Sequence, residues 1–470
     1  MTTLYERYAD EIAGLIRRQA LRAGDRLPSV RQASASRGIS PSTVFEAYYL
    51  LEARGLVEAR SRSGYYVKAA AATLPPPGLA RPGDATEVAI SELVFQVLGS
   101  SGRPDMVPLG SAFPSPALFP LAALARHLGQ GMRALPPQRL VQDLAPGNDD
   151  LRRQIVRRYG IDGTAVSAEE IVMTNGAMEA LGLCLQAVTR PGDVVAVESP
   201  TFYAALQALE RLQLRALEVP TDAREGVDLD ALAGLLDRHR VKACWFMPSF
   251  QNPLGALMPQ AKREALVDLL ARHQVPLIED DVYAELHADA RKPVPAKAFD
   301  RAGLVMHCGS FSKCLAPGYR VGWVAAGRFA QRVERLRLMS SLSPALPSQQ
   351  AVAAYLAEGG YDRHLRRLRR ALSESRRAML AAVRQHFPVG TRVHEPQGGY
   401  FLWVELPSSV DALELHRRAR AQGIGLAPGP LFSPAAGFAH CIRLNHGHAD
   451  DPRIDGAVQT LGALAWAMMA

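Results

Sequence analysis

Short apolar runs alternate with longer stretches of helical periodicity from about residue 86 onward, and this alternation limits the possible fold more than any other feature. The runs lie at residues 171–173, 194–197, 241–247, 275–278, 304–307 and 321–325. Strands that alternate with helices form a mainly parallel sheet with helices on both faces. After about residue 343, helical stretches precede strand-like runs at 400–405 and 440–444, so we expect a second, smaller α/β lobe.

The first 68 residues follow a different pattern. Apolar residues at helical spacing, with charges between them, predict an amphipathic helix at residues 4–16. A short helix is expected after Ser29, which can cap it, and a second one from Pro41 to Gly55, after a turn at Gly38. Two short helices joined by a tight turn predict a helix-turn-helix.

Residues 56–67 combine two short apolar segments with a charged tip, which is typical of a β-hairpin and would form the wing of a winged helix-turn-helix. Residues 69–85 are rich in alanine, proline and glycine and lack apolar periodicity, as a tether does. We therefore predict a winged helix-turn-helix domain at 1–68, a linker at 69–85 and a large α/β domain at 86–470.

Charge is concentrated at the N-terminus. The chain has 470 residues, 48% of them hydrophobic, which is more than one hydrophobic core usually organises. Residues 1–68 contain eleven cations and seven anions, a net charge of +4, while the whole chain has +8. A cationic N-terminal domain attracts polyanions.

The cysteines and the apolar segments indicate the compartment. The five cysteines are scattered, without the paired spacing of a disulfide framework or a zinc site: Cys184, Cys244, Cys308, Cys314 and Cys441. The sequence has no basic and apolar N-terminal signal and no apolar stretch of roughly 18 to 20 residues that could span a bilayer. We therefore expect a cytoplasmic protein without a metal site or a membrane partner.

The stretch from Gly309 to Trp323 carries the most specific chemical signal of the large domain. Lys313 directly follows a predicted strand. Groups that can bind a phosphate dianion surround it, namely Ser310, Ser312 and Arg320. A Schiff base needs this arrangement, because the phosphate anchors the cofactor while the lysine condenses with its aldehyde. A surface lysine in a polar loop is the alternative.

Here the chain resembles fold-type I aminotransferases, and nearly its whole length resembles the MocR branch of GntR-type regulators. The resemblance implies pyridoxal 5'-phosphate as the cofactor, with Lys313 as the lysine of the internal aldimine. It also implies that Asp280 pairs with the pyridinium nitrogen and that Tyr283 and Asn252 hydrogen-bond the phenolic oxygen of the ring. Asp281 is the alternative acid, since adjacent residues of an extended chain point in opposite directions.

The same resemblance assigns the remaining contacts. Gly176, Ala177 and Met178 stand at the start of a predicted helix, where free amides and the helix dipole favour a phosphate. Phe202 matches the aromatic residue that stacks on the pyridine ring, with a core position as the alternative. Arg443 matches the arginine that binds a substrate α-carboxylate, with a surface arginine as the alternative.

Three positions depart from the family pattern. Gln142 stands where a tyrosine commonly reaches the cofactor phosphate of the partner subunit, and an amide donates to phosphate differently from a phenol. Ala177 and Met178 replace hydroxyl or amide side chains, so they can offer only backbone N–H groups. These departures put efficient catalysis in more doubt than cofactor binding.

The N-terminal domain closely resembles the GntR signature, which implies double-stranded operator DNA as a partner. The second helix would enter the major groove, with Ser42 and Thr43 near its N-terminus. Phosphate or minor-groove contacts would come from Arg31 and from the wing residues Arg62, Ser63 and Gly64. Pro41 and Phe45 depart from the polar residues that relatives often have there. A protein-interaction module is the alternative.

We therefore predict a transcription regulator that acts as a head-to-tail homodimer and senses a small amine, an amino acid or pyridoxal phosphate at its aldimine site. A working aminotransferase is the first alternative, because its minimum parts are all present: Lys313, Asp280 and Arg443. A DNA-binding module whose large domain only dimerises is the second alternative, although it leaves the lysine and the phosphate cluster unexplained.

Overall fold

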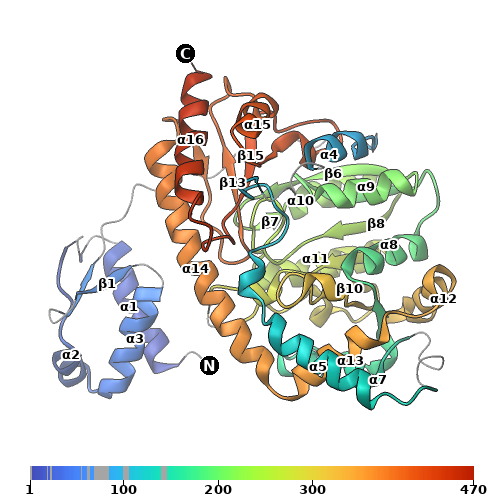
Figure 1. Ribbon diagram of the computed structural model, residues 1–470, viewed down its shortest axis with the longest axis horizontal. Helices are drawn as coiled ribbons and strands as arrows, with labels where there is room; N and C mark the ends of the chain where they lie inside the picture. The colour runs from blue at the N-terminus through green and yellow to red at the C-terminus, as the bar shows by residue number, and fades with distance from the viewer. Residues whose placement is uncertain are drawn as a thin grey trace. The chain divides into compact units, whose positions relative to one another are not determined.

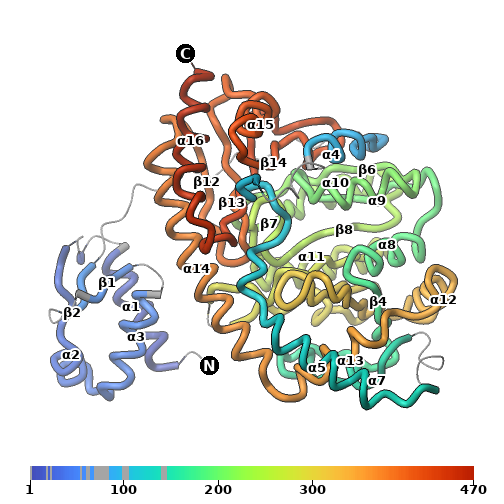
Figure 2. The backbone as a smooth tube through the Cα atoms, in the orientation of Figure 1, coloured from blue at the N-terminus to red at the C-terminus, as the bar shows by residue number. Residues whose placement is uncertain are grey.

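The computed structural model describes residues 3–17, 20–21, 24–53, 56–60, 64–67, 84–98, 105–138, 146–289 and 291–469. The chain forms two compact units, 1–73 and 74–470, and each is described by itself. Figures 1 and 2 show the elements and the backbone path within each unit. No helix in the described ranges is long and apolar enough to cross a membrane.

The described part of the N-terminal unit contains three helices and a two-stranded hairpin. Its elements are α1 (Leu4–Arg17), α2 (Val30–Arg37), α3 (Pro41–Ala53), β1 (Val57–Arg60) and β2 (Gly64–Val67). The strands pair antiparallel, with Val57 opposite Val67. Helix α3 buries Val44, Tyr48 and Leu51 in the core of this unit. The hydroxyl group of Tyr48 donates a hydrogen bond to the carbonyl oxygen of Pro28 at 2.9 Å.

Local signals explain the boundaries of the two short helices. The Ser29 side chain accepts from the backbone N–H of Gln32, whose side chain accepts in return from the backbone N–H of Ser29, so the two form a capping box at the start of α2. Gly38 ends this helix with a φ of 64°, a left-handed conformation that glycine adopts without strain. Helix α3 starts at the predicted Pro41.

The described part of the large unit contains a nine-stranded sheet. Its order is β3 (Thr86–Glu87), β6 (Arg215–Asp222), β5 (Val194–Ser199), β8 (Val241–Phe246), β9 (Leu277–Asp280), β10 (Val305–Ser310), β11 (Gly322–Ala325) and β4 (Ile171–Thr174), with β7 (Gly226–Val227) paired to β6. The strands from β6 to β10 run parallel, whereas β11 is antiparallel to both of its neighbours. The predicted mainly parallel sheet is confirmed.

Helices cover both faces of this sheet (Figure 1). Along β5, Val195 and Val197 pack with α8 (Ala177–Val188) and α9 (Tyr203–Arg211) on one face, whereas Ala196 packs with the helices of the other face. Those helices are α10 (Leu229–Arg238) and α11 (Gln260–His273). Further helices of this unit are α4 (Ser91–Leu98), α5 (Leu121–Ala134), α7 (Asp149–Ile161), α12 (Ala330–Ser341) and α13 (Leu346–Ala357).

The C-terminal part forms the smaller lobe, as predicted. Its four-stranded sheet has the order β12 (Arg392–Val393), β13 (Phe401–Glu405), β15 (Cys441–Asn445) and β14 (Ala427–Pro428). Its helices are α14 (Gly360–His386), α15 (Ala412–Ala421) and α16 (Ile454–Ala467). Val107 and Leu109, from the start of the large unit, complete the core of this lobe.

Substitution of Gly322, at the start of β11, would test how closely the backbone packs beneath the candidate site. A methyl group there would come within 2.5 Å of the Gly176 carbonyl carbon. Gly322→Ala should therefore lower the free energy of unfolding of the large unit by about 1–3 kcal/mol. Urea unfolding followed by tryptophan fluorescence measures this, because all tryptophans lie in this unit. The control Gly234→Ala, in α10 with nothing within 4 Å, should be neutral or stabilising. Equal losses in both variants would contradict this packing.

Candidate cofactor-binding site

The carboxyl ends of three neighbouring parallel strands meet at one edge of the large sheet. Asp280 ends β9, Lys313 follows β10 and Asn252 follows β8. Open α/β sheets bind their ligands at this edge. A cavity of about 180 Å³ lies there, and the predicted residues that line it are Ala177, Met178, Phe202, Asp280, Tyr283, Ser310, Ser312, Lys313 and Arg320.

Lys313 reaches this cavity as a poorly solvated amine. Its Nζ donates to the carbonyl oxygen of Ala112 at 2.8 Å and lies 3.8 Å from the ring centroid of Phe113. Desolvation, together with the positive charge of Arg443, lowers the pKa of Lys313 to about 7 against the opposing effect of Asp280. A lysine with this pKa has a large fraction of free amine near neutral pH, as imine formation requires.

Asp280 is a buried carboxyl group with an unused oxygen. Burial raises its pKa to about 7. The nearby indole N–H of Trp245 favours the carboxylate form of Asp280 and so opposes this rise. Even so, Asp280 Oδ1 and Trp245 Nε1 both lack a hydrogen-bond partner among the described residues. A buried acceptor without a partner is costly. It fits a ligand that brings a charged N–H group, as the ring of pyridoxal phosphate does.

An anion cradle forms where β10, β11 and α8 approach one another. Gly176 caps α8 with a φ of 90°, and a methyl group there would collide with the Arg320 guanidinium. Arg320 donates to Ser312 Oγ and to the carbonyl oxygen of Asn175, both at 3.1 Å. Ser310 Oγ lies 2.9 Å from Ser312 Oγ. Free amides at the helix start, hydroxyl groups and a guanidinium together fit a phosphate dianion.

Arg443 and Asn252 form a buried pair next to the cavity without lining it. Arg443 Nη1 donates to Asn252 Oδ1 at 3.0 Å, and Nη2 donates to the carbonyl oxygen of Gly110 at 2.8 Å. The guanidinium carbon lies 4.1 Å from the ring centroid of Phe401. Two donors, Arg443 Nε and Asn252 Nδ2, lack partners among the described residues. An incoming carboxylate could satisfy Arg443 Nε.

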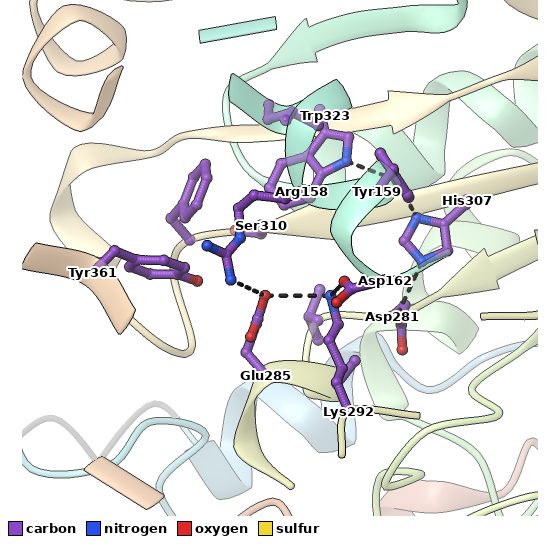
Figure 3. Close-up of a pocket in the computed structure, with 14 residues that line it drawn as sticks. Arg158, Tyr159, Asp162, Asp281, Glu285, Lys292, His307, Ser310, Trp323 and Tyr361 are labelled. Atoms are coloured by element: carbon purple, nitrogen blue, oxygen red, sulfur yellow. Dashed lines mark hydrogen bonds and ion pairs between the residues drawn. The ribbon is translucent and has the colours of Figure 1, made fainter. Parts of the chain in front are cut away.

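Asp281, directly after β9, lines a second cavity of about 40 Å³ whose lining does not include Lys313 (Figure 3). His307 Nε2 donates to Asp281 Oδ2 at 2.9 Å, since a carboxylate oxygen accepts. His307 Nδ1 then accepts from the Tyr159 hydroxyl at 2.6 Å, and that hydroxyl accepts from Trp323 Nε1 at 3.0 Å. Asp281 therefore faces this network, while Asp280 faces the amine.

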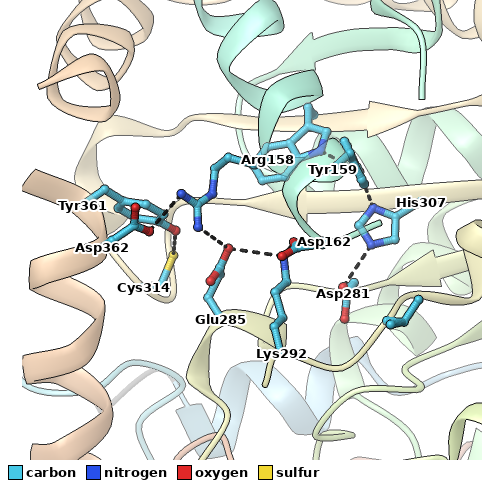
Figure 4. A network of polar contacts seen from close by, with 12 residues as sticks. Arg158, Tyr159, Asp162, Asp281, Glu285, Lys292, His307, Cys314, Tyr361 and Asp362 are labelled. Carbon is cyan, nitrogen blue, oxygen red and sulfur yellow. Dashed lines mark hydrogen bonds and ion pairs between the residues drawn. The ribbon is translucent and has the colours of Figure 1, made fainter. Parts of the chain in front are cut away.

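A second polar cluster lies at the same cavity as this network (Figure 4). Glu285 follows Tyr283 and accepts from Arg158 at 3.2 Å, Lys292 at 3.3 Å and Arg369 at 3.0 Å. Burial alone would raise the pKa of Glu285, but these three cations lower it to about 2. Because Arg158 belongs to α7 and Arg369 to α14, the cluster fixes the segment after Asp280 to both helices.

Sequence reasoning missed several of these partners. Lys313 meets Ala112 and Phe113, which precede it by about two hundred residues. Tyr159 and His307 are likewise 148 positions apart. Neither contact leaves a local pattern in the sequence, so only the fold brings these groups together. The predicted Gln142 lies outside the described residues.

Among the predicted DNA-contacting residues, Ser42 and Thr43 lie at the start of α3, Arg31 lies in α2 and Gly64 belongs to β2. Ser40 Oγ accepts from the Thr43 N–H at 3.1 Å and lies 2.8 Å from Ser42 Oγ. Ser42 and Arg31 are exposed. Gly64 starts β2 with a φ of 106°. Arg62 and Ser63 fall outside the described residues, so their contacts stay predictions.

The lowered pKa of Lys313 predicts how its reactivity depends on pH. Pyridoxal phosphate added to cofactor-free protein should bind Lys313 at a rate that rises with pH through about 7 and levels off roughly one unit higher. Absorbance near the violet edge of the visible spectrum follows the reaction, and Lys313→Ala should stay colourless. A rate that still rises near pH 10 would contradict the shift.

The same lowered pKa predicts how Lys313 affects the stability of the fold. Between pH 7 and 10.5, Lys313 keeps its proton in the unfolded chain and has lost it in the folded protein, so its contribution to the free energy of unfolding should rise with pH.

The network around His307 predicts a loss of stability when Tyr159 loses its hydroxyl group. Tyr159→Phe leaves His307 Nδ1 and Trp323 Nε1 buried without their partner. The variant should lose about 1–3 kcal/mol in urea unfolding. Tyr319→Phe, at a half-buried tyrosine outside this network, is the control and should change little. Two equal effects would show that the network adds nothing specific.

Comparisons with known proteins agree with both units. Residues 138–461 match the family model of aminotransferases of class I and II. Residues 4–67 match that of bacterial regulatory proteins of the gntR family. The chain is 46% identical over 460 residues to the uncharacterized HTH-type transcriptional regulator YdcR of Escherichia coli (strain K12), with 98% of each chain covered.

Two further similarities bear on the family. The chain is 28% identical over 435 residues to the probable rhizopine catabolism regulatory protein MocR of Rhizobium meliloti, covering 90% of this chain and 85% of that protein. It is also similar to the crystal structure of LysN, an α-aminoadipate aminotransferase from Thermus thermophilus, complexed with N-(5'-phosphopyridoxyl)-L-leucine. The TM-score is 0.73 at 30% identity, with 81% of this chain and 99% of that chain covered.

Proposed function

Because the chain belongs to the aminotransferase class I and II family and carries a gntR-family helix-turn-helix domain, a combination consistent with the MocR subfamily, we propose that ligand binding at Lys313 controls its binding to DNA. One observation carries the proposal. A helix-turn-helix domain of the gntR family is fused to a unit whose cavity is lined by a lysine amine, a carboxyl group with one unpaired oxygen and an anion cradle. Pyridoxal phosphate, when bound, supplies an aldehyde that condenses with amines and an electron-poor ring.

Residues of the large unit would hold this cofactor by its phosphate, its ring and its aldehyde group. The phosphate would lie in the cradle formed by Gly176, Ala177, Met178, Ser310, Ser312 and Arg320. Asp280 would accept a hydrogen bond from the ring nitrogen and keep it protonated. Tyr283 and Asn252 would donate to the ring oxygen, while Phe202 would stack on the ring. Lys313 would exchange its bond to the Ala112 carbonyl oxygen for the cofactor.

The effector is a small amine, and the structure favours an amino acid. Arg443 Nε is a buried donor without a partner among the described residues. An α-carboxylate would satisfy this donor, while a simple amine would leave it unpaired at a cost. Recognition of the carboxylate therefore adds affinity and selectivity to amine chemistry at Lys313.

Regulation requires that the effector binds with different affinity to two arrangements of the protein. Of the groups that would meet the effector, Lys313 follows β10 and Arg443 lies in β15 of the smaller lobe. Nearby, the Glu285 cluster connects the end of β9 to α7 and α14. We propose that the protein acts on DNA as a homodimer, head to tail, because paired winged helices match paired half-sites.

A working aminotransferase is the second candidate function. The retained groups favour it, because Lys313, Asp280 and Arg443 are the residues that the resemblance to aminotransferases assigns to transamination. Turnover of an amino acid with a 2-oxo acid at about 1 per second or faster would place the protein in the usual range of enzymes.

The coupling between the two units gives the decisive test. DNA selected from a random duplex library would be titrated with full-length protein, with and without pyridoxal phosphate and each candidate amino acid. An effective ligand should change DNA affinity about 5- to 150-fold. Lys313→Ala should abolish the change, whereas Lys242→Ala, at an exposed lysine of β8, should keep it. Unchanged DNA affinity in every condition, together with rapid transamination, would favour the enzyme.

A further inference from the structure

Helix α3 exposes two large aromatic side chains. Phe45 is 51% exposed and Tyr49 is 54% exposed, while Val44 and Tyr48 beside them are fully buried. Phe45 and Tyr49 are four positions apart, so they lie on the same face of the helix, one turn from each other. Ser42, also exposed, precedes Phe45 by almost one turn on this face.

This face has no occupant within the described part of the N-terminal unit. Exposed apolar side chains that adjoin one another form a patch, and contiguous apolar patches are typical of interaction sites. The unit carries a net charge of +4 over residues 1–68, and Arg31 on α2 is exposed. A cationic unit favours a polyanion over an apolar protein partner. The positive charge of the unit therefore favours DNA as the partner that covers this face of α3.

The composition of α3 narrows what it can read in DNA. The helix, PSTVFEAYYLLEA, contains no lysine and no arginine, the residues that most often bind guanine. Its exposed face offers two aromatic rings, the small hydroxyl group of Ser42 and the carboxylate of Glu46, which only accepts. In the major groove, the apolar group that the base edges present to such rings is the 5-methyl group of thymine.

We propose that Phe45 and Tyr49 read thymine 5-methyl groups in the major groove, so that the operator half-site is specified by apolar contact. The inference rests on the proposed function, because it assigns α3 to the groove. It goes further by naming the base and the chemical group that the helix recognises. Each buried methyl should contribute about fourfold to affinity, and more when both half-sites of a dimer lose it.

Replacing single thymines by deoxyuridine tests this, since the replacement removes only the methyl group. Duplexes selected by the full-length wild type from a random library should contain thymine in each half-site. Deoxyuridine at the contacted thymines should weaken wild-type binding about fourfold per methyl in fluorescence anisotropy. Phe45→Ala should bind the thymine duplex more weakly and lose most of this sensitivity, while Phe45→Leu should keep part of it. Neither variant should change the salt dependence, because no phosphate contact is lost.

Phe95→Ala is the matched control, at a phenylalanine of α4 that is 76% exposed in the other unit. It should respond to deoxyuridine as the wild type does. The inference would be overturned if no deoxyuridine substitution changed the affinity of the wild type. It would also be overturned if Phe45→Ala and Tyr49→Ala both stayed fully sensitive to deoxyuridine. A change of oligomeric mass in Phe45→Ala with unaltered DNA affinity would also overturn it, in favour of a protein partner. If the wild type binds no DNA at all, the proposed function fails first.

Discussion

The parallel pairing of β9 with β10 is the constraint on which the candidate site depends. This pairing matches Asp280 with Cys308, so the buried carboxyl group and the segment that leads to Lys313 leave the sheet at the same edge. Burial destabilises the charged form of both groups. The pKa of Asp280 is therefore raised and that of Lys313 lowered, both to about 7. A ligand that brings a protonated ring nitrogen and a carbonyl carbon would relieve both.

The same strand separates two carboxyl groups that are neighbours in the sequence. Asp280 lines the cavity that contains Lys313, and Asp281 lines the cavity that contains His307 and Tyr159. Side chains alternate along an extended chain, so one strand can supply both sides. On the far side, hydrogen bonds and the Glu285 cluster hold the backbone of β9 and its exit in place. Positional precision at Asp280 therefore depends on residues that never meet the ligand.

The local parts of this arrangement could be predicted from the sequence, and the long-range parts could not. Apolar alternation predicted the mainly parallel sheet and the smaller lobe, because strand and helix periods are local properties. The surroundings of Lys313 were visible because Ser310, Ser312 and Arg320 are close to it in sequence. The partners of Lys313 and His307 come from segments far away in the chain, and a sequence pattern contains no information about such distances.

The departures at Ala177 and Met178 change the side chains at the anion cradle and leave its backbone donors in place. Its donors at the start of α8 are backbone amides, which any residue provides, so the lost hydroxyl groups leave that part intact. The close approach of Gly176 and Gly322 and the guanidinium of Arg320 then define the space that a phosphate can enter. On the proposed function, such a cradle would hold a dianion with fewer side-chain hydrogen bonds than a complete set would supply. On the proposed function this weaker grip suits a sensor, because occupancy of the site has to follow the concentration of its ligand, whereas an enzyme gains from a cofactor that never leaves.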